Sequence, residues 1–217
     1  MLGELAYFFV PTTGRVALAS FPRSGNTWLR VLLEDITGER TGSIYQDDGI
    51  HSRGSEGILI KTHSRDRFRY EKAVHLIRNP YDSLYSYYLY STNSGATGNR
   101  TFEEFLPNAV ETLRQHTEHW QKASYERLVI RYEDLSSNPA SILEGCLKYL
   151  DRVAELSDIQ DAVERNEIGR MKEKYKSIDT RVIREGGSNK NMDKYTSKQK
   201  QLVRDNLSKS MAEHYSL

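Results

Sequence analysis

The sequence predicts an α/β protein in which a mostly parallel central sheet is covered by helices on both faces, giving three α/β/α layers. Short apolar runs alternate with amphipathic helical patterns, and this alternation is typical of parallel strands joined by crossover helices. The 217 residues suffice for one sizeable core, and there is no internal repeat or low-complexity linker. We therefore expect a single domain over residues 1–217.

The predicted strands are short apolar runs bounded by polar or turn-forming residues. They cover Arg15–Phe21, Gly57–Thr62, Ala73–Ile77 and Leu128–Ile130.

The predicted helices begin at residues that cap helices well. Asn26–Thr37 carries apolar residues at helical spacing, and Gly38 is a typical stop. Further helix starts are Asn79-Pro80, Asn138-Pro139, and the capping-box segments Thr101–Glu104 and Thr196–Gln199. Residues 177–195 are polar and predict a mobile loop.

Composition and charge narrow the class of protein. Hydrophobic residues make up 37% and charged residues 28%, and the net charge of +1 does not indicate a nucleic-acid partner. Residues 165–204 hold twelve Lys or Arg against five Asp or Glu, which fits either a solvated face or a basic flap over an anionic ligand. We expect a cytoplasmic protein, because Cys146 is the sole cysteine and no membrane span or signal peptide is recognisable.

The turn after the first strand has the composition of an anion site. It reads Ser-Phe-Pro-Arg-Ser-Gly-Asn-Thr-Trp-Leu-Arg over Ser20–Arg30 and leads directly into a helix. The first N–H groups of a helix are unpaired and lie at the positive end of its dipole. Arg23 and the hydroxyl and amide side chains around it add donors, so we expect this turn to hold a phosphate or a sulfate.

Polar residues also follow the other predicted strands. Arg23 follows the first strand, His63 the second, Arg78 the third and Tyr132 the fourth. Ligands of open α/β sheets bind beyond the carboxyl ends of the strands. We therefore expect these four residues to meet on one rim of the sheet.

Five segments, in this order, resemble the sulfotransferases that use 3′-phosphoadenosine 5′-phosphosulfate (PAPS). They are Pro-Arg-Ser-Gly-Asn-Thr-Trp over 22–28, Leu-Ile-Lys-Thr-His over 59–63, His-Leu-Ile-Arg-Asn-Pro-Tyr-Asp over 75–82 with Ser86, Val-Ile-Arg-Tyr-Glu-Asp-Leu over 129–135, and Arg-Glu-Gly over 184–186 followed by Tyr195-Thr196. Together they span most of the chain. The resemblance implies a fold similar to that of P-loop NTPases, although a Walker A motif is absent.

The resemblance also implies a reaction and roles for particular residues. The sulfuryl group of PAPS would pass by in-line displacement to an acceptor hydroxyl or amine, leaving 3′-phosphoadenosine 5′-phosphate (PAP), with no metal. His63 would be the general base, Arg23 would stabilise the leaving 5′-phosphate, and Lys61 and Ser86 would assist. The residues implied to bind the donor are Arg23, Ser24, Gly25, Asn26, Thr27, Trp28, Arg78, Ser86, Tyr132, Arg184, Glu185 and Gly186.

The sequence departs from the family pattern at several positions. Arg23 stands where many members have lysine, Asn26 where many have threonine, and Glu185 where lysine is usual. The segment that contacts adenine can only be placed near Asn166–Met171. We expect a small-molecule or carbohydrate acceptor, although the sequence does not identify it: a sugar hydroxyl, a small alcohol or phenol, and a peptide side chain stay open. Loops such as 39–57 and 91–100 would build its pocket, and the oligomeric state stays open.

Other interpretations need features that the sequence lacks or does not favour. A nucleotide kinase or NTPase with a degenerate phosphate loop would need a Walker lysine and an acidic strand end. A non-catalytic nucleotide-binding protein would not need His63. His116 and His119 lack a third metal ligand, and we interpret them as part of a helix surface.

Overall fold

The computed structural model describes residues 14–45, 50, 54, 56–64, 70–122, 126–176 and 190–216. Its sheet has five parallel strands in the order β2-β3-β1-β4-β5. The strands are β1 (Val16–Ser20), β2 (Gly42–Ser43), β3 (Ile60–Thr62), β4 (Lys72–Ile77) and β5 (Arg127–Arg131). The predicted parallel α/β architecture is confirmed.

The register of the sheet brings the carboxyl ends of four strands to the same level. Ala19 of β1 lies opposite Thr62 of β3, and Ser20 lies opposite Leu76 of β4. Ile77 of β4 in turn lies opposite Arg131 of β5. The residues that directly follow these strands are therefore neighbours at one edge, as expected for a ligand site of this sheet type.

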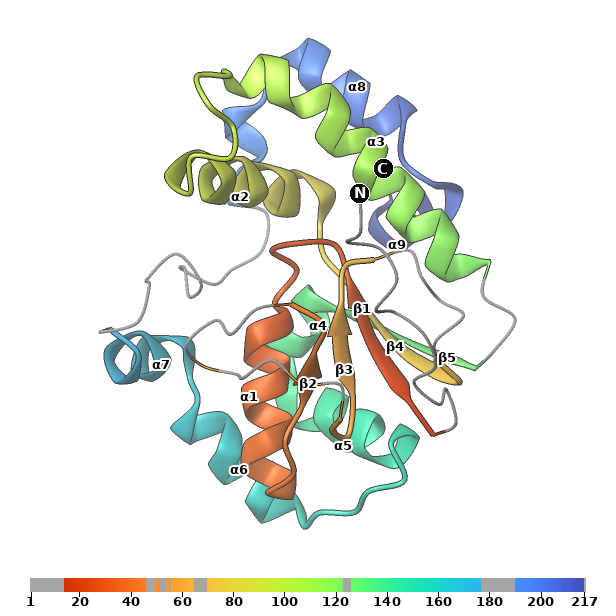
Figure 1. Cartoon of the computed structure of the whole chain (residues 1–217), viewed down its shortest axis with the longest axis vertical. Helices are drawn as coiled ribbons and strands as arrows, with labels where there is room; N and C mark the ends of the chain where they lie inside the picture. Colours follow the sequence, from red (N-terminus) through yellow and green to blue (C-terminus); the bar gives the residue numbers. More distant parts are fainter. Residues whose placement is uncertain are drawn as a thin grey trace, which may run out of the picture.

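Helices form a layer around the sheet and a second group beyond its end (Figure 1). Helices α1, α5 and α6 lie together beside the sheet, whereas α2, α3 and α8 lie together beyond the strands (Figure 1). The helix bounds are α1 (Asn26–Thr37), α2 (Pro80–Asn93), α3 (Phe102–Gln121), α4 (Tyr132–Ser137), α5 (Pro139–Tyr149), α6 (Leu156–Arg165), α7 (Ile168–Lys174), α8 (Ser197–Asp205) and α9 (Lys209–Tyr215), with a 3₁₀ turn η2 (Met192–Lys194).

The predicted helix caps are present in the structure. The Asn79 side chain accepts a hydrogen bond from the Tyr81 N–H, and Pro80 opens α2. Both capping boxes are formed, at the starts of α3 and α8. Gly38 ends α1 in the left-handed conformation, with its N–H on the Glu34 carbonyl oxygen.

Both faces of the sheet are buried, but by side chains of different size. Leu18 points into a large core formed with α1, α5 and α6. Its neighbours Ala17 and Ala19 point to the other face, where the fully buried Trp120 of α3 packs against them. Alternate residues of β1 thus contact different layers, as the period of two in a strand requires.

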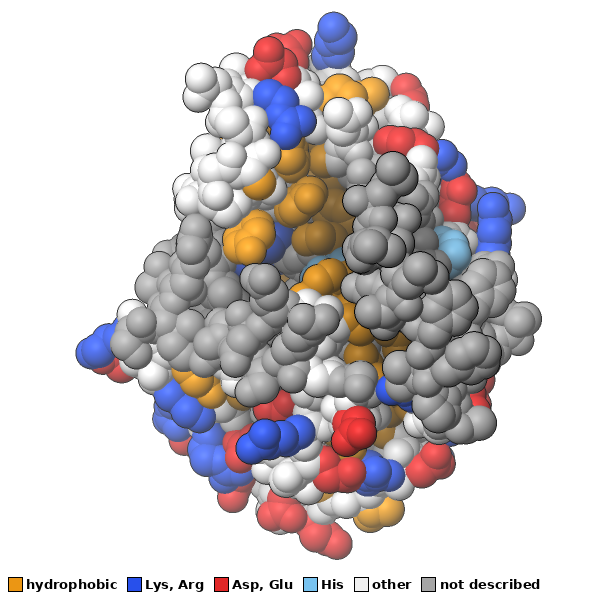
Figure 2. All heavy atoms as spheres, in the orientation of Figure 1, with side chains coloured by type: hydrophobic (Ala, Val, Ile, Leu, Met, Phe, Trp, Pro, Cys, Tyr) orange, Lys and Arg blue, Asp and Glu red, His pale blue; other side chains and the backbone are white. Residues whose placement is uncertain are grey.

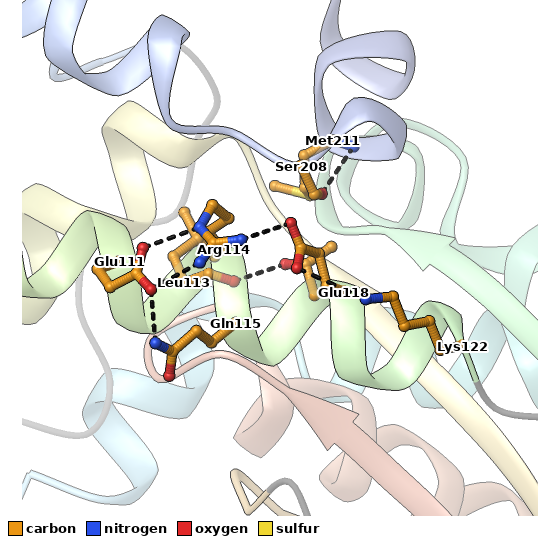
Figure 3. Close-up of polar contacts among 9 residues, drawn as sticks. Glu111, Leu113, Arg114, Gln115, Glu118, Lys122, Ser208 and Met211 are labelled. Carbon is orange, nitrogen blue, oxygen red and sulfur yellow. Dashed lines mark hydrogen bonds and ion pairs between the residues drawn. The ribbon is translucent and has the colours of Figure 1, made fainter.

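The outer face of α3 is charged and the inner face is apolar. The Arg114 guanidinium donates to Glu111 at 2.7 Å and to Glu118 at 2.7 Å, spanning two turns of the helix (Figure 3). In the same view, the Ser208 hydroxyl caps α9 by accepting from the Met211 N–H at 3.3 Å (Figure 3). These contacts stabilise the helices locally and leave the inward faces for the core.

Three features of the fold differ from the sequence-based expectation. The end of the predicted mobile loop is ordered, because it includes the 3₁₀ turn η2 and the buried Tyr195. Strand β2 has only two residues, too few for an apolar period, and was not predicted. His116 is buried rather than on a helix surface, because it lies one turn from both Leu113 and Trp120 on the inward face of α3. Its ring meets the buried His75 ring edge to face at a centroid distance of 5.8 Å.

None of the helices in the described ranges combines the length and apolarity needed to cross a bilayer.

Candidate active site

The turn between β1 and α1 forms the base of the site. Gly25 adopts φ 96° at the N-terminal end of α1, and a Cβ there would lie 2.4 Å from Tyr132 Cδ2. Glycine is therefore required both by the backbone conformation and by the ring that packs on it. Ser24 is buried and Thr27 is partly exposed beside the free amides of the helix start.

Two arginines from separate strand ends meet above this turn. The Arg78 Nη1 donates to the main-chain oxygen of Arg23 at 2.9 Å, which ties the end of β4 to the end of β1. The Arg23 Nε donates to Ser86 Oγ of α2 at 3.3 Å, and its guanidinium lies 5.3 Å from the Tyr90 ring centroid. Two permanent positive charges thus share one small region, which favours an anionic ligand.

Aromatic rings border the arginine pair on the side of α1 and α4. The Arg78 guanidinium lies 4.4 Å from the Tyr132 ring centroid, a cation–π distance. Trp28 meets the same ring edge to face at 6.2 Å. The Trp28 indole N–H donates to the Asn166 carbonyl oxygen at 2.9 Å, so Asn166 belongs to this region, inside the segment that the sequence located only loosely.

His63 follows β3 and is held by the end of β1. Its Nδ1 lies 2.6 Å from the Ser20 carbonyl oxygen. Because a carbonyl oxygen can only accept, Nδ1 carries the proton and Nε2 of the neutral ring is left with its lone pair. The Asn26 side chain donates to Ser20 Oγ at 3.0 Å, so it points toward Ser20, the residue that holds the His63 ring.

The surroundings of His63 favour the neutral imidazole. Burial is the largest cause and lowers its pKa to about 4, and the charges of Lys61, Arg23 and Arg30 act in the same direction. The hydrogen bond to Ser20 opposes this shift only in part. At neutral pH the ring is therefore uncharged and able to accept a proton.

The turn that carries His63 is anchored by residues that sequence reasoning missed. The His63 N–H donates to the Tyr45 hydroxyl at 2.7 Å, and the Ser64 N–H donates to Thr62 Oγ1 at 3.0 Å. The Trp120 indole N–H donates to the Ser64 carbonyl oxygen at 3.0 Å. No periodicity or motif marks Tyr45 or Trp120 as part of a site, because their roles arise from tertiary contact.

The molecule is hollowed above this turn. Figure 2 shows a hollow with apolar side chains on its walls and a cationic and a histidine side chain deep within it. Aromatic residues beside the site include Phe21 and Tyr87, whose rings meet edge to face at 5.3 Å. Within the described residues, no group of three or more His, Cys, Asp or Glu side chains is arranged to hold a metal ion.

The residues predicted from four of the five segments come together. His63 and Asn26 both contact Ser20, Arg23 contacts Ser86 and Arg78, and Arg78 and Trp28 both contact Tyr132. Lys61 lies in β3 next to them, with its ammonium 5.8 Å from the Tyr45 ring centroid. Arg184, Glu185 and Gly186 lie outside the described residues, and the assigned roles of all these residues remain predictions.

The chain is similar in sequence to known proteins. Residues 59–216 match the family model described as the sulfotransferase domain. A WSCD family member of Drosophila melanogaster is 30% identical over 188 residues, covering 75% of this chain and 59% of the relative. Sulfotransferase 1B1 of Mus musculus is 24% identical over 202 residues, covering 76% of this chain and 68% of that protein. The chain spans about three fifths of the Drosophila relative's length.

Solved structures share the fold at low sequence identity. Mouse sulfotransferase SULT7A1 complexed with PAP superposes with a TM-score of 0.70 at 17% identity, covering 91% of this chain and 86% of that chain. Retinol dehydratase in complex with androsterone and PAP gives a TM-score of 0.64 at 17% identity, covering 93% and 82% of the two chains.

Proposed function

Because this chain belongs to the sulfotransferase domain family, we propose that it transfers the sulfuryl group of PAPS to a hydroxyl or amine of a small-molecule or carbohydrate acceptor. One observation carries the proposal. Arg23, His63 and Arg78, from three strand ends, lie around the glycine turn that opens α1. A doubly phosphorylated adenosine needs cations at two places and a flat apolar contact for its base, and this rim offers both.

The donor would lie across the arginine pair. The helix start over Ser24–Thr27, together with Arg23, would bind the 5′-phosphate. Arg78 would bind the 3′-phosphate, with Ser86 within reach of the same region. Trp28 and Tyr132 would pack against the adenine. The similar structures of SULT7A1 and retinol dehydratase are complexes with PAP, which supports this choice of donor.

The chemistry would follow from His63 and Arg23. The acceptor oxygen would attack the sulfur in line, forming a new S–O bond while the bond from sulfur to the 5′-phosphate oxygen breaks. His63 Nε2 would take the acceptor proton, since Nδ1 is occupied by the Ser20 carbonyl. Arg23 and the α1 amides would stabilise the negative charge that develops on the leaving phosphate.

The proposed donor site is tested by calorimetry with PAP and AMP. PAP should bind more tightly than AMP, because only PAP carries the phosphate assigned to Arg78. Arg78→Ala should weaken PAP binding by ~2–5 kcal/mol and AMP binding far less, as expected for loss of a charge partner. Arg152→Ala is the matched control, since Arg152 forms its ion pair with Glu39, away from the site. Equal affinities for the two nucleotides would contradict the proposal.

The proposed chemistry is tested by sulfate transfer from labelled PAPS to a panel of acceptors. Wild-type protein should label at least one hydroxyl or amine compound. His63→Ala should abolish this transfer but leave PAP binding nearly intact, because the imidazole acts on the acceptor. Full transfer by His63→Ala would exclude His63 as the base.

A further inference from the structure

Tyr45 contacts His63 in two ways at once. Its hydroxyl accepts from the His63 main-chain N–H at 2.7 Å. Its ring is stacked on the imidazole, with a centroid distance of 5.2 Å and an interplanar angle of 29°. One side chain thus holds both the backbone and the ring of the residue that we assign as the base.

The position of Tyr45 is itself well determined by the sheet edge. The Tyr45 N–H donates to Ser43 Oγ at 3.2 Å, and the Ile44 N–H donates to the Lys61 carbonyl oxygen at 3.4 Å. Strand β2 ends at Ser43, so the ladder with β3 stops before it reaches His63. The Tyr45 hydroxyl supplies the acceptor that a longer β2 would otherwise provide to the His63 N–H.

The Tyr45 phenol remains protonated and acts by position. Burial raises its pKa, although hydrogen bonds with His63, Thr62 and Ser64 oppose that shift. A neutral phenol can accept from an amide N–H, but it does not compete with a neutral imidazole for the acceptor proton. Its contribution therefore passes through His63.

From these contacts we infer that Tyr45 is a positioning residue for the base. The Tyr45 hydroxyl holds the His63 main chain, its ring limits rotation of the imidazole, and the Ser20 carbonyl fixes the Nδ1–H tautomer. Nε2 is thereby kept in one orientation for proton transfer. This inference rests on the proposed function, since it treats His63 as the base, but its contacts can be tested without turnover.

Two variants separate the two contacts, and a third provides the control. Tyr45→Phe removes the hydroxyl and keeps the ring, whereas Tyr45→Leu removes both. Tyr149→Phe also deletes a phenol hydroxyl that accepts from a strand amide, the N–H of Ala73 at 3.2 Å. That contact lies at the start of β4, at the edge of the sheet opposite the candidate site. A purely structural role for Tyr45 would make Tyr45→Phe and Tyr149→Phe behave alike.

Kinetics at saturating acceptor give the first readout. Tyr45→Phe should lower kcat by roughly 10–100-fold, the range expected when a catalytic group is slightly misplaced, and Tyr45→Leu should lower it further. KM for PAPS and the affinity for PAP should stay at wild-type values, and Tyr149→Phe should keep wild-type kcat. A wild-type kcat in both Tyr45 variants would overturn the inference.

Nitrogen NMR of histidine-labelled protein gives a readout that is independent of activity. Wild-type His63 should show a single Nδ1–H tautomer. Tyr45→Leu should show a mixture of both tautomers, because an imidazole that is free to rotate leaves the Ser20 carbonyl in part of the molecules. An unchanged tautomer in Tyr45→Leu would overturn the inference even if the protein transfers sulfate. Absence of transfer by wild-type protein with every acceptor would instead contradict the proposed function, and the NMR comparison would still decide the role of Tyr45.

Discussion

A neutral imidazole surrounded by cations is the central feature of the site at the scale of single residues. Lys61 is the charged group that lowers the pKa of His63 most, after burial, and Arg23 and Arg30 add to its effect. A bound anion would offset these charges and bring the pKa of His63 back toward its ordinary value. The same cations would therefore attract the donor and keep the base unprotonated before the donor arrives.

This arrangement predicts the effect of removing one cation. Lys61→Gln should raise the pKa of His63 in the ligand-free protein, because the largest Coulombic contribution is lost. An NMR titration of the His63 ring between pH 3 and 8 measures the shift, and saturation with PAP should move the wild-type pKa in the same direction. Lys72→Gln serves as the control, since Lys72 pairs with Asp151 at the start of β4. A His63 pKa that is the same in Lys61→Gln and wild type would contradict the electrostatic account.

At the scale of elements, the turn into α1 is the one to which we assign donor binding. Its glycine has a left-handed backbone and also carries the Tyr132 ring, which lies against the Arg78 guanidinium. The glycine that ends the same helix, Gly38, is also left-handed, at φ 68°, but a Cβ there would meet nothing within 4 Å. The two ends of one helix therefore separate the cost of backbone strain from the cost of a steric clash.

Alanine substitutions at Gly25 and Gly38 should thus differ in their effects on stability and on PAP binding. Gly38→Ala should lower the free energy of unfolding by roughly 1–2 kcal/mol, the cost of a left-handed alanine, and leave PAP binding unchanged. Gly25→Ala should cost more and should weaken PAP binding, because the new methyl group displaces Tyr132 and with it the cation–π contact of Arg78. Denaturant unfolding and calorimetry measure the two effects. Equal losses of stability with unchanged PAP affinity in both variants would argue against this packing.

The whole molecule encloses neutral histidines beneath the site. His75 of β4 and His116 of α3 are buried, with their rings in contact. Burial is the main cause that lowers the pKa of His75 to about 3 and holds the pKa of His116 well below 6.5. Both residues bind protons near pH 6.5 in the unfolded chain but not in the folded protein. The free energy of unfolding therefore depends on pH through these two buried histidines.

Stability should fall as the pH is lowered below 6.5. The unfolded state then binds more protons than the folded state, so each buried histidine reduces the free energy of unfolding by up to about 1.4 kcal/mol per pH unit. The contribution is complete above pH 6.5 and is lost progressively toward the folded pKa values. Urea unfolding at pH 7.5 and pH 5 measures this slope. His116→Gln should give a shallower slope than wild type, and an identical slope would show that His116 does not stay neutral in the fold.

Much of the fold and part of the site follow from local signals in the chain. The cap residues Asn79, Thr101 and Thr196 start helices where predicted, because capping is a contact between neighbours in sequence. Strand β2 escaped prediction because two residues carry no period, and His116 was misassigned because one polar residue does not reveal which helix face is inward.

Reading the chain alone was enough to predict the alternation of strands and helices, the glycine turn before α1, and the positions of Arg23, His63, Arg78 and Tyr132 after β1, β3, β4 and β5. These features depend on spacing along the chain and on the common direction of parallel strands. Three features emerge only in the folded protein: the tautomer of His63, its contact with Tyr45, and the burial of His116. Those depend on which distant groups meet in three dimensions, and such meetings leave no pattern in the local sequence.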